Sequence, residues 1–154
     1  MKNKDEYFMK FALKEAKLAL KKAEVPIGCV IVKDDKIIAS QHNLKETDQN
    51  ATHHAEILAI NQASKILNSW RLDECDIYVN VEPCLMCLGA IVSARFTRLI
   101  YGVKDTKYGS LENILDKYLE NFNHHLQVTS NILAKESRLI LASFFKKLRG
   151  ENKS

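Results

Sequence analysis

Hydrophobic residues follow two patterns along this chain. They recur at every third or fourth position in some stretches, and they form short β-branched runs in others. The first pattern is typical of amphipathic helices and the second of buried strands. Helices are expected over residues 5–23, 54–67, 84–94, 110–119 and 132–148, and strands over residues 25–33, 36–40, 76–81, 98–101 and 126–129.

The order of these elements indicates an α/β fold. One helix is followed by two strands, which are joined at Asp34-Asp35 as a hairpin, and helices and strands then alternate to the end of the chain. We expect a five-stranded, mostly parallel mixed sheet with helices on both faces, and chemistry where strand ends meet helix starts. No repeat or Pro-, Gly- or Ser-rich linker interrupts residues 1–154, so one domain is expected. Residues 40–52 predict a loop, and Ser110 is the expected N-cap of its helix.

The bulk composition excludes several classes of protein. Hydrophobic residues make up 46% of the chain and charged residues 27%, which favours a globular domain over a disordered or fibrous one. The longest apolar run, residues 25–32, is broken by Pro26 and Gly28 and is far shorter than the roughly 20 residues of a membrane span. The N-terminus lacks the apolar core of a secretory signal, so a cytoplasmic protein is expected. The net charge of +4 is too small to identify a polyanionic partner.

The four cysteines are not expected to form disulfides, because close spacing in a chain without an export signal indicates metal or redox chemistry. Cys29 lies within an apolar run and is predicted to be a small buried hydrophobe. Cys75 stands alone before a strand and receives no role. Cys84 and Cys87 form a Cys-x-x-Cys pair, which requires an explanation.

Two motifs that each begin a predicted helix carry the candidate chemistry: His54-Ala55-Glu56 and Pro83-Cys84-Leu85-Met86-Cys87. Cys84 and Cys87 lie three positions apart on a first turn, so their sulfurs share a face. The helix dipole there favours thiolates, the form that binds metal. With the imidazole of His54 they make three ligands for Zn²⁺ and leave the fourth tetrahedral position open for water.

Glu56 determines what that open position does. In a regular helix Glu56 would turn away from His54, but both can approach one metal at a helix start, where the first residue is not fully helical. The carboxylate would take a proton from zinc-bound water and pass it to substrate nitrogens. The set predicts hydrolysis of an aromatic C–NH₂ group.

A structural zinc site and a redox cysteine pair are the alternatives on spacing alone. A structural site needs a fourth protein ligand, for which His53 and Cys75 are the candidates. Neighbouring residues rarely both reach one small ion, so His53 is assigned to the surroundings of the metal.

These motifs, with others, resemble the bacterial tRNA-specific adenosine deaminase family over nearly the whole chain. The matching stretches are Glu24-Val25-Pro26-Ile27-Gly28, His54-Ala55-Glu56-Ile57, Val81-Glu82-Pro83-Cys84-Leu85-Met86-Cys87, Gly89-Ala90-Ile91 and Phe144-Phe145. The resemblance implies a three-layer α/β/α cytidine deaminase-like fold and a homodimer with active sites near the subunit interface. It also implies one Zn²⁺ per subunit, held by His54, Cys84 and Cys87, with Glu56 as the proton shuttle.

The resemblance further implies a substrate and its contacts. The partner is a tRNA anticodon stem-loop, whose wobble adenosine is converted to inosine. Asn43 matches the asparagine that contacts the target base, and Asp105 and Lys107 match the Asp-x-Lys pattern of the RNA-facing loop. Without the resemblance, Asn43 would be assigned to capping its own loop backbone. The basic C-terminus, Lys146, Lys147, Arg149 and Lys153, either meets phosphates or is a solvated helix end.

The sequence therefore predicts hydrolytic deamination by addition and elimination. Zinc hydroxide attacks C6 while Glu56 protonates N1, and Glu56 then gives a proton to the departing ammonia. The alternative enzyme is a deaminase of free guanine or cytosine, which would have the same zinc site. A zinc-stabilised RNA-binding module is the non-enzymatic alternative, although it has no use for the Glu56 carboxylate.

Overall fold

The computed structural model describes residues 2–109, 111–121 and 124–152, and the predicted order of elements is confirmed. The helices are α1 (Lys2–Lys21), α2 (Ala55–Leu67), α3 (Leu85–Ser93), α4 (Leu111–Leu119) and α5 (Ala134–Asn152). The strands are β1 (Gly28–Lys33), β2 (Lys36–His42), β3 (Cys75–Val81), β4 (Arg98–Val103) and β5 (Gln127–Thr129). Ser110, the expected N-cap of α4, lies outside the described residues.

The five strands form one mixed sheet in the order β2-β1-β3-β4-β5. β1 is antiparallel to both of its neighbours, whereas β3, β4 and β5 are parallel to one another. Four strands therefore point the same way and β1 alone runs against them. The predicted hairpin joins β1 to β2 at Asp34 and Asp35, whose φ angles of 50° and 61° are those of a tight turn that follows the strand twist.

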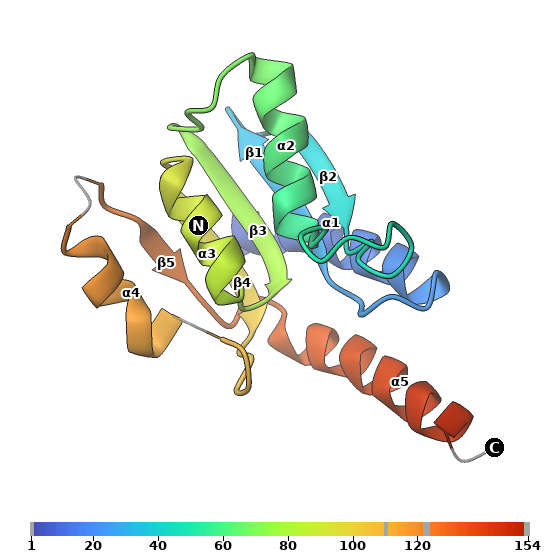
Figure 1. Ribbon diagram of the computed structural model, residues 1–154. Helices are drawn as coiled ribbons and strands as arrows, with labels where there is room; N and C mark the ends of the chain where they lie inside the picture. The colour runs from blue at the N-terminus through green and yellow to red at the C-terminus, as the bar shows by residue number, and fades with distance from the viewer. Residues whose placement is uncertain (1, 110, 122–123, 153–154) are drawn as a thin grey trace.

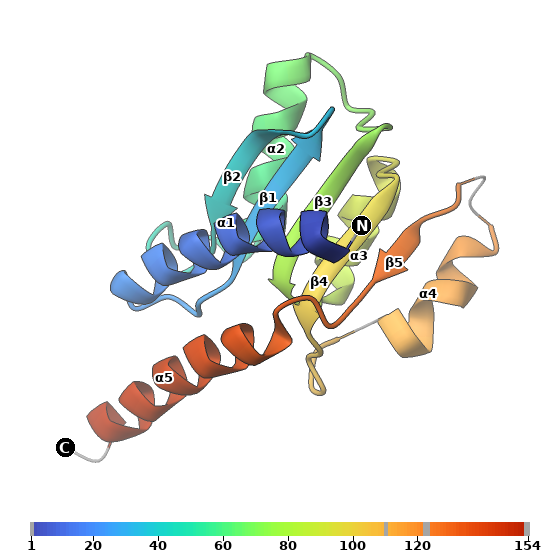
Figure 2. The ribbon, with the colours of Figure 1, turned by 180° about the vertical axis from the view of Figure 1, so that it is seen from behind.

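Helices cover both faces of the sheet, α1 and α5 on one and α2 and α3 on the other (Figures 1 and 2). Alternate residues of a strand point to opposite faces. Cys29 and Ile31 of β1 accordingly pack in the core with α2 and α3, while Val30 and Val32 pack in the core with α1. The three-layer α/β/α fold is thus built on the period-two pattern of the strands.

The end of the sheet at which β3 and β4 finish is where the chain can assemble a site (Figure 1). Val81 and Val103, the last residues of these parallel strands, are paired. The chain segment that leads into α3 and the loop that follows β4 therefore leave the sheet side by side. Among the described residues no helix combines the length and the apolar character needed to cross a bilayer.

Candidate active site

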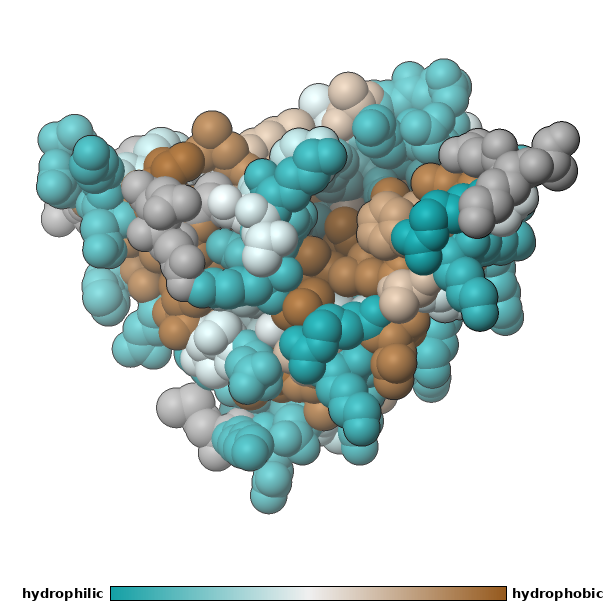
Figure 3. Space-filling view, turned by 90° about the horizontal axis from the view of Figure 1, so that it is seen from below, coloured by the Kyte–Doolittle hydropathy of each residue, from teal (hydrophilic) through white to brown (hydrophobic). Residues whose placement is uncertain are grey.

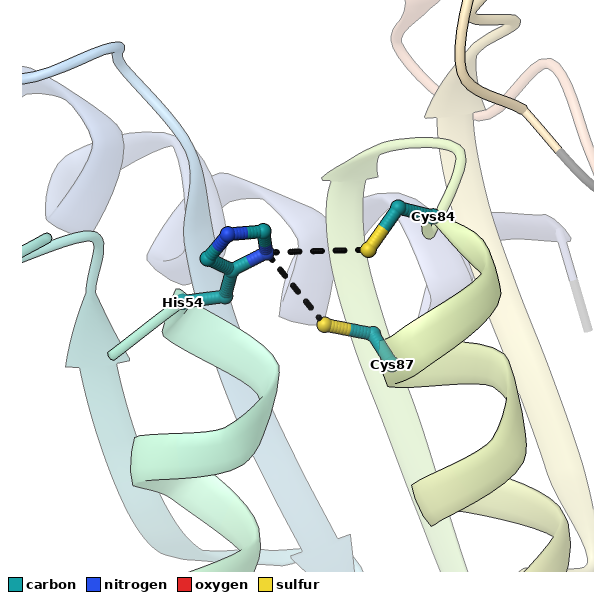
Figure 4. Close-up of side chains that lie close together, drawn as sticks. All are labelled: His54, Cys84 and Cys87. Atoms are coloured by element: carbon teal, nitrogen blue, oxygen red, sulfur yellow. Dashed lines mark hydrogen bonds between the residues drawn. The ribbon is translucent and has the colours of Figure 1, made fainter. Parts of the chain in front are cut away.

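The two predicted motifs meet at this end of the sheet, each at the start of a helix. His54 is the N-cap of α2, with an extended backbone (φ −76°, ψ 155°). Cys84 is the N-cap of α3 and is also extended (φ −73°, ψ 174°), so the helix begins one residue later than expected, at Leu85. Cys87 lies in the first turn of α3. Figure 4 shows the ring of His54 pointing from α2 toward both sulfurs.

The distances between these three side chains fit a tetrahedral zinc ion. The Nδ1 atom of His54 lies 3.7 Å from the Sγ atom of Cys84 and 3.6 Å from that of Cys87. Zinc bonds of roughly 2.3 Å to sulfur and 2.0–2.1 Å to nitrogen, at the tetrahedral angle, separate the two atoms by about 3.6 Å. The ligand atoms of His54, Cys84 and Cys87 all lie within 4.8 Å of one another. Within the described part of the chain, these three residues form the group that could hold a metal ion.

The cluster is also prepared electrostatically for a cation. A hydrogen bond from Cys87 lowers the pKa of the Cys84 thiol to about 4, so Cys84 is a thiolate at neutral pH. The same hydrogen bond raises the pKa of Cys87, and the Cys84 thiolate raises the pKa of His54. The three groups thus share protons in the absence of metal, and a bound metal would displace those protons.

Glu56 is the buried carboxylate beside this cluster. Its side chain is only 3% exposed, and its Oε1 atom has no hydrogen-bond partner among the described residues. Burial raises the pKa of Glu56 to about 7, and the Cys84 thiolate raises it while His54 lowers it. The extended backbone of His54 explains how residues two positions apart both face the site. A buried polar atom without a partner requires an explanation, and a catalytic role is one of the explanations that apply in native proteins.

The alternative fourth ligands are not part of the cluster. His53 pairs instead with Asp48, its Nδ1 atom 2.7 Å from the carboxylate. Cys75 begins β3, whereas Cys84 follows the end of that strand, so the length of the strand separates Cys75 from the cluster. Cys29 is buried as predicted, and burial raises the pKa of its thiol well above the ordinary value.

Asn43 is buried at the end of β2, and its side chain serves the loop backbone. Its Oδ1 atom accepts a hydrogen bond from the N–H of Lys45, and its Nδ2 atom donates to the carbonyl of Val25 at 3.3 Å. These are the contacts of a residue that shapes its own loop. Among the described residues no hydrogen bond joins Asn43 to the candidate metal site, so its role as a substrate contact stays a prediction.

Asp105 and Lys107 lie in the loop after β4. The Oδ1 atom of Asp105 accepts hydrogen bonds from the N–H groups of Lys107 and Tyr108, which closes a tight turn. Lys107 is exposed, and its Nζ atom lies 5.2 Å from the centre of the Tyr108 ring. Their contact with RNA likewise stays a prediction.

Two buried glutamates that hold the loops around the site were missed by the sequence analysis. Glu24 is 1% exposed and accepts hydrogen bonds from the N–H groups of Glu46 and Thr47. Glu82 is 6% exposed and accepts hydrogen bonds from the N–H groups of Asp105, in the loop after β4, and of Leu111, which begins α4. A shared signal was available, because both glutamates stand at the edge of an apolar run within two residues of a proline.

Comparison with known proteins identifies the class that this fold and cluster define. The model of the MafB19-like deaminase family matches residues 2–149, almost the whole chain. The curated tRNA-specific adenosine deaminase of Bacillus subtilis is 46% identical over 153 residues, covering 97% of this chain and 94% of that protein. The chain therefore belongs to the deaminases and, among them, to the tRNA-specific adenosine deaminase family.

Solved structures agree with this assignment. A structure from work on A-to-I editing by tRNA:A34 deaminases at the wobble position superposes with a TM-score of 0.82 and 40% identity, over 88% of this chain and 99% of that one. The guanine deaminase of Bacillus subtilis superposes with a TM-score of 0.62 and 42% identity, over 64% of each chain. The expected cytidine deaminase-like α/β/α fold is confirmed by the first of these superpositions.

Proposed function

We propose that the protein is a zinc-dependent hydrolase that converts the wobble adenosine of a tRNA anticodon to inosine. The observation that carries this proposal is the His54, Cys84 and Cys87 cluster with zinc spacing and the orphaned Glu56 oxygen beside it. The curated relative, 46% identical over nearly the full length, is a tRNA-specific adenosine deaminase. Because that relative acts on adenosine in tRNA, we infer the same substrate for this chain.

The residues divide the work of the reaction. His54, Cys84 and Cys87 would hold one Zn²⁺ per subunit, which when bound supplies a water molecule activated for attack near neutral pH. Glu56 takes a proton from that water and delivers it to N1 of the adenine as the C6–O bond forms. It then carries the proton of the new C6 hydroxyl to the amino group, so that the C6–N bond breaks, ammonia leaves and C6 becomes the carbonyl of inosine.

The target base must leave its stack to reach Glu56, and this costs least in a single-stranded loop such as an anticodon. Figure 3 shows the end of the molecule at which β2, β3 and β4 finish in Figure 1. Hydrophobic side chains form patches on this end, one of them near its middle, and hydrophilic side chains lie between and around them. An apolar surface of this kind suits an extruded aromatic base. Asn43, Asp105 and Lys107 are proposed to contact the nucleotides there.

The proposal includes a homodimer in the cytoplasm, where tRNA is found. Leu85 and Met86, in the first turn of α3 beside the metal cluster, are 54% and 37% exposed. Large apolar side chains on one exposed turn are typical of a surface that is covered by a partner. A homodimer predicts twice the chain mass in sedimentation equilibrium, and the Leu85→Asp variant should shift the protein toward the monomer. A wild-type monomer would contradict the dimer.

Comparing substrates tests the proposed activity. The purified protein is incubated with an anticodon stem-loop RNA that has adenosine at the wobble position and, separately, with free adenine, guanine and cytosine. Inosine in the RNA and ammonia in the same amount are expected. Product from free bases alone would overturn the tRNA substrate.

Replacing Glu56 separates the enzyme from a zinc-stabilised RNA-binding module. Glu56→Ala should abolish inosine formation while zinc content, measured by metal analysis, and the melting temperature stay near those of the wild type. Glu74→Ala, which removes an exposed carboxylate at the far end of β3, is the matched control and should keep full activity. Inosine formation by the Glu56 variant would contradict the role of the carboxylate.

Guanine deamination is the second candidate, because the guanine deaminase of Bacillus subtilis is 42% identical over the part that superposes. The two activities share the metal cluster and differ in the base that they hold. A higher kcat/KM for free guanine than for the RNA would favour this candidate.

A further inference from the structure

The loop at residues 104–109 begins beside the metal cluster. β4 ends at Val103, which pairs with Val81, and the N–H of Glu82 donates to the carbonyl of Val103 at 2.9 Å. Cys84 follows Glu82 by two residues. The loop after β4 and the segment that carries a proposed zinc ligand are therefore joined by a backbone hydrogen bond where both leave the sheet.

Glu82 fixes both ends of this loop. Its Oε1 atom accepts a hydrogen bond from the N–H of Asp105, and its Oε2 atom accepts one from the N–H of Leu111, each at 3.1 Å. A carboxylate that accepts buried N–H bonds makes strong, charge-assisted contacts. Gly109 lies against the same carboxylate so closely that a Cβ atom there would overlap Glu82 and the Asp105 carbonyl.

The fixed loop presents an aromatic ring to solvent. Tyr108 is 65% exposed, and Lys107 lies over its ring. The tight turn closed by the Asp105 carboxylate sets the direction of both residues. An aromatic side chain with a neighbouring cation is the usual platform on which unpaired nucleic-acid bases stack.

We propose that Tyr108, with Lys107 above it and Glu82 as the positioning residue beneath, stacks on an unpaired base of the RNA next to the target adenosine. The inference rests on the proposed function. A base that enters the metal site must come from an unpaired stretch, so its neighbours are also free to stack. The platform belongs to the loop that leaves the sheet beside the segment that leads to Cys84.

Steady-state kinetics on the anticodon stem-loop RNA tests the platform. Tyr108→Ala should raise KM about tenfold, since loss of one stacked base typically weakens binding by about this factor or more, and should leave kcat within about twofold. Tyr108→Phe keeps the ring and should restore the wild-type KM. Tyr108 is exposed, so neither variant endangers folding.

Trp70→Ala is the matched control. Trp70 is 61% exposed and has the Arg71 guanidinium 5.3 Å from its ring, but it follows the far end of α2. The KM of Trp70→Ala should equal that of the wild type. An unchanged KM for Tyr108→Ala, or an equal rise for Trp70→Ala, would overturn the platform. If the wild-type enzyme forms no inosine in RNA, it is the proposed function that fails.

Two further variants test the positioning role of Glu82. Glu82→Gln replaces one acceptor oxygen by an N–H₂ group, and Gly109→Ala intrudes on the same carboxylate without a change of charge. Both should raise KM in the same direction as Tyr108→Ala, with zinc content unchanged. They should also speed hydrogen exchange at the amides of Asp105 and Leu111, whereas exchange in β4 stays slow. Unchanged loop exchange together with unchanged KM would refute the positioning role.

Discussion

A single buried carboxylate near the start of the chain holds α1 to the sheet. Asp5 is 2% exposed and accepts hydrogen bonds from Arg98 Nη2 at 2.7 Å, Arg98 Nη1 at 3.1 Å and the hydroxyl of Tyr78 at 2.8 Å. Removing one partner of a buried pair leaves the other charge poorly compensated, which costs more than the pair itself contributes. Asp76, 3.5 Å from Arg98, compensates part of that charge.

Asp5→Ala should therefore lower the free energy of unfolding by about 3 kcal/mol, the lower end of the range for broken buried pairs. Asp73→Ala is the matched control, because Asp73 pairs with Arg71 on the surface, where both side chains are about half exposed. Its cost should be much smaller than that of Asp5→Ala, because exposed ion pairs contribute little to stability. Urea unfolding of the two variants measures both values, and equal losses would show that burial does not strengthen the Asp5 contacts.

At the scale of elements, α1 lies unusually close to β1 because Gly28 has no side chain. A Cβ atom at Gly28 would overlap the backbone of α1 at Ala12 and Ala16. The N–H of Gly28 also donates to the buried Oδ1 atom of Asn80 at 2.8 Å. Any side chain here must push the helix away from the sheet.

Gly28→Ala should destabilise the protein by about 3 kcal/mol, at the upper end of the cost of overpacking. The same substitution at Gly150, where nothing lies within 4 Å of a new Cβ atom, should stabilise α5 slightly, by about 0.5 kcal/mol. Opposite signs in denaturant unfolding are the expected result. A neutral Gly28→Ala would mean that α1 moves freely on the sheet.

The loop at residues 43–53 depends on the charge of Glu24. Burial raises the pKa of Glu24, but the hydrogen bonds from Thr47 and Glu46 outweigh it and bring the pKa below its ordinary value of 4.5. A carboxyl whose pKa is lower in the folded state stabilises the fold fully above that ordinary value, and the contribution is lost as pH falls through the lowered pKa.

We therefore expect hydrogen exchange at the amides of Glu46 and Thr47, corrected for the intrinsic pH dependence, to accelerate as the solution is acidified below pH 4.5. Glu24→Gln should show fast exchange at these amides at neutral pH too. Glu46→Gln, which changes an exposed carboxylate in the same loop, should behave like the wild type. Protection that does not depend on pH would contradict the role of the Glu24 charge.

The sequence predicted the elements better than their arrangement. The spacing of apolar residues gave all ten elements in order, the turn at Asp34-Asp35 and the burial of Cys29. It could not show that β1 lies between β2 and β3, because strand order depends on contacts between distant segments. The candidate metal ligands were found because each stands at a helix start that local pattern reveals. Glu24 and Glu82 were missed because their partners lie 22 to 29 residues away.

At the scale of the whole molecule, the buried Asp5 and Arg98 pair and the candidate site lie at opposite ends of the strands. The Asp5 and Arg98 pair lies where β4 begins, and the metal cluster and the loops held by Glu24 and Glu82 lie where the strands β2, β3 and β4 end. A cluster at the edge of a fold that is stabilised elsewhere can be changed without unfolding the chain.

Removal of metal tests this separation for the molecule as a whole. α2 and α3, at whose starts the proposed zinc ligands lie, share one apolar core on the sheet, so the chain is expected to stay folded without zinc. Chelation should abolish inosine formation and leave the far-ultraviolet circular dichroism unchanged. The melting temperature should fall by on the order of 5–10 °C, since a ligand at a hundred times its Kd adds about 2.7 kcal/mol. Added zinc should restore activity, and Cys75→Ala should bind zinc normally. Unfolding on chelation would show instead that the metal is structural.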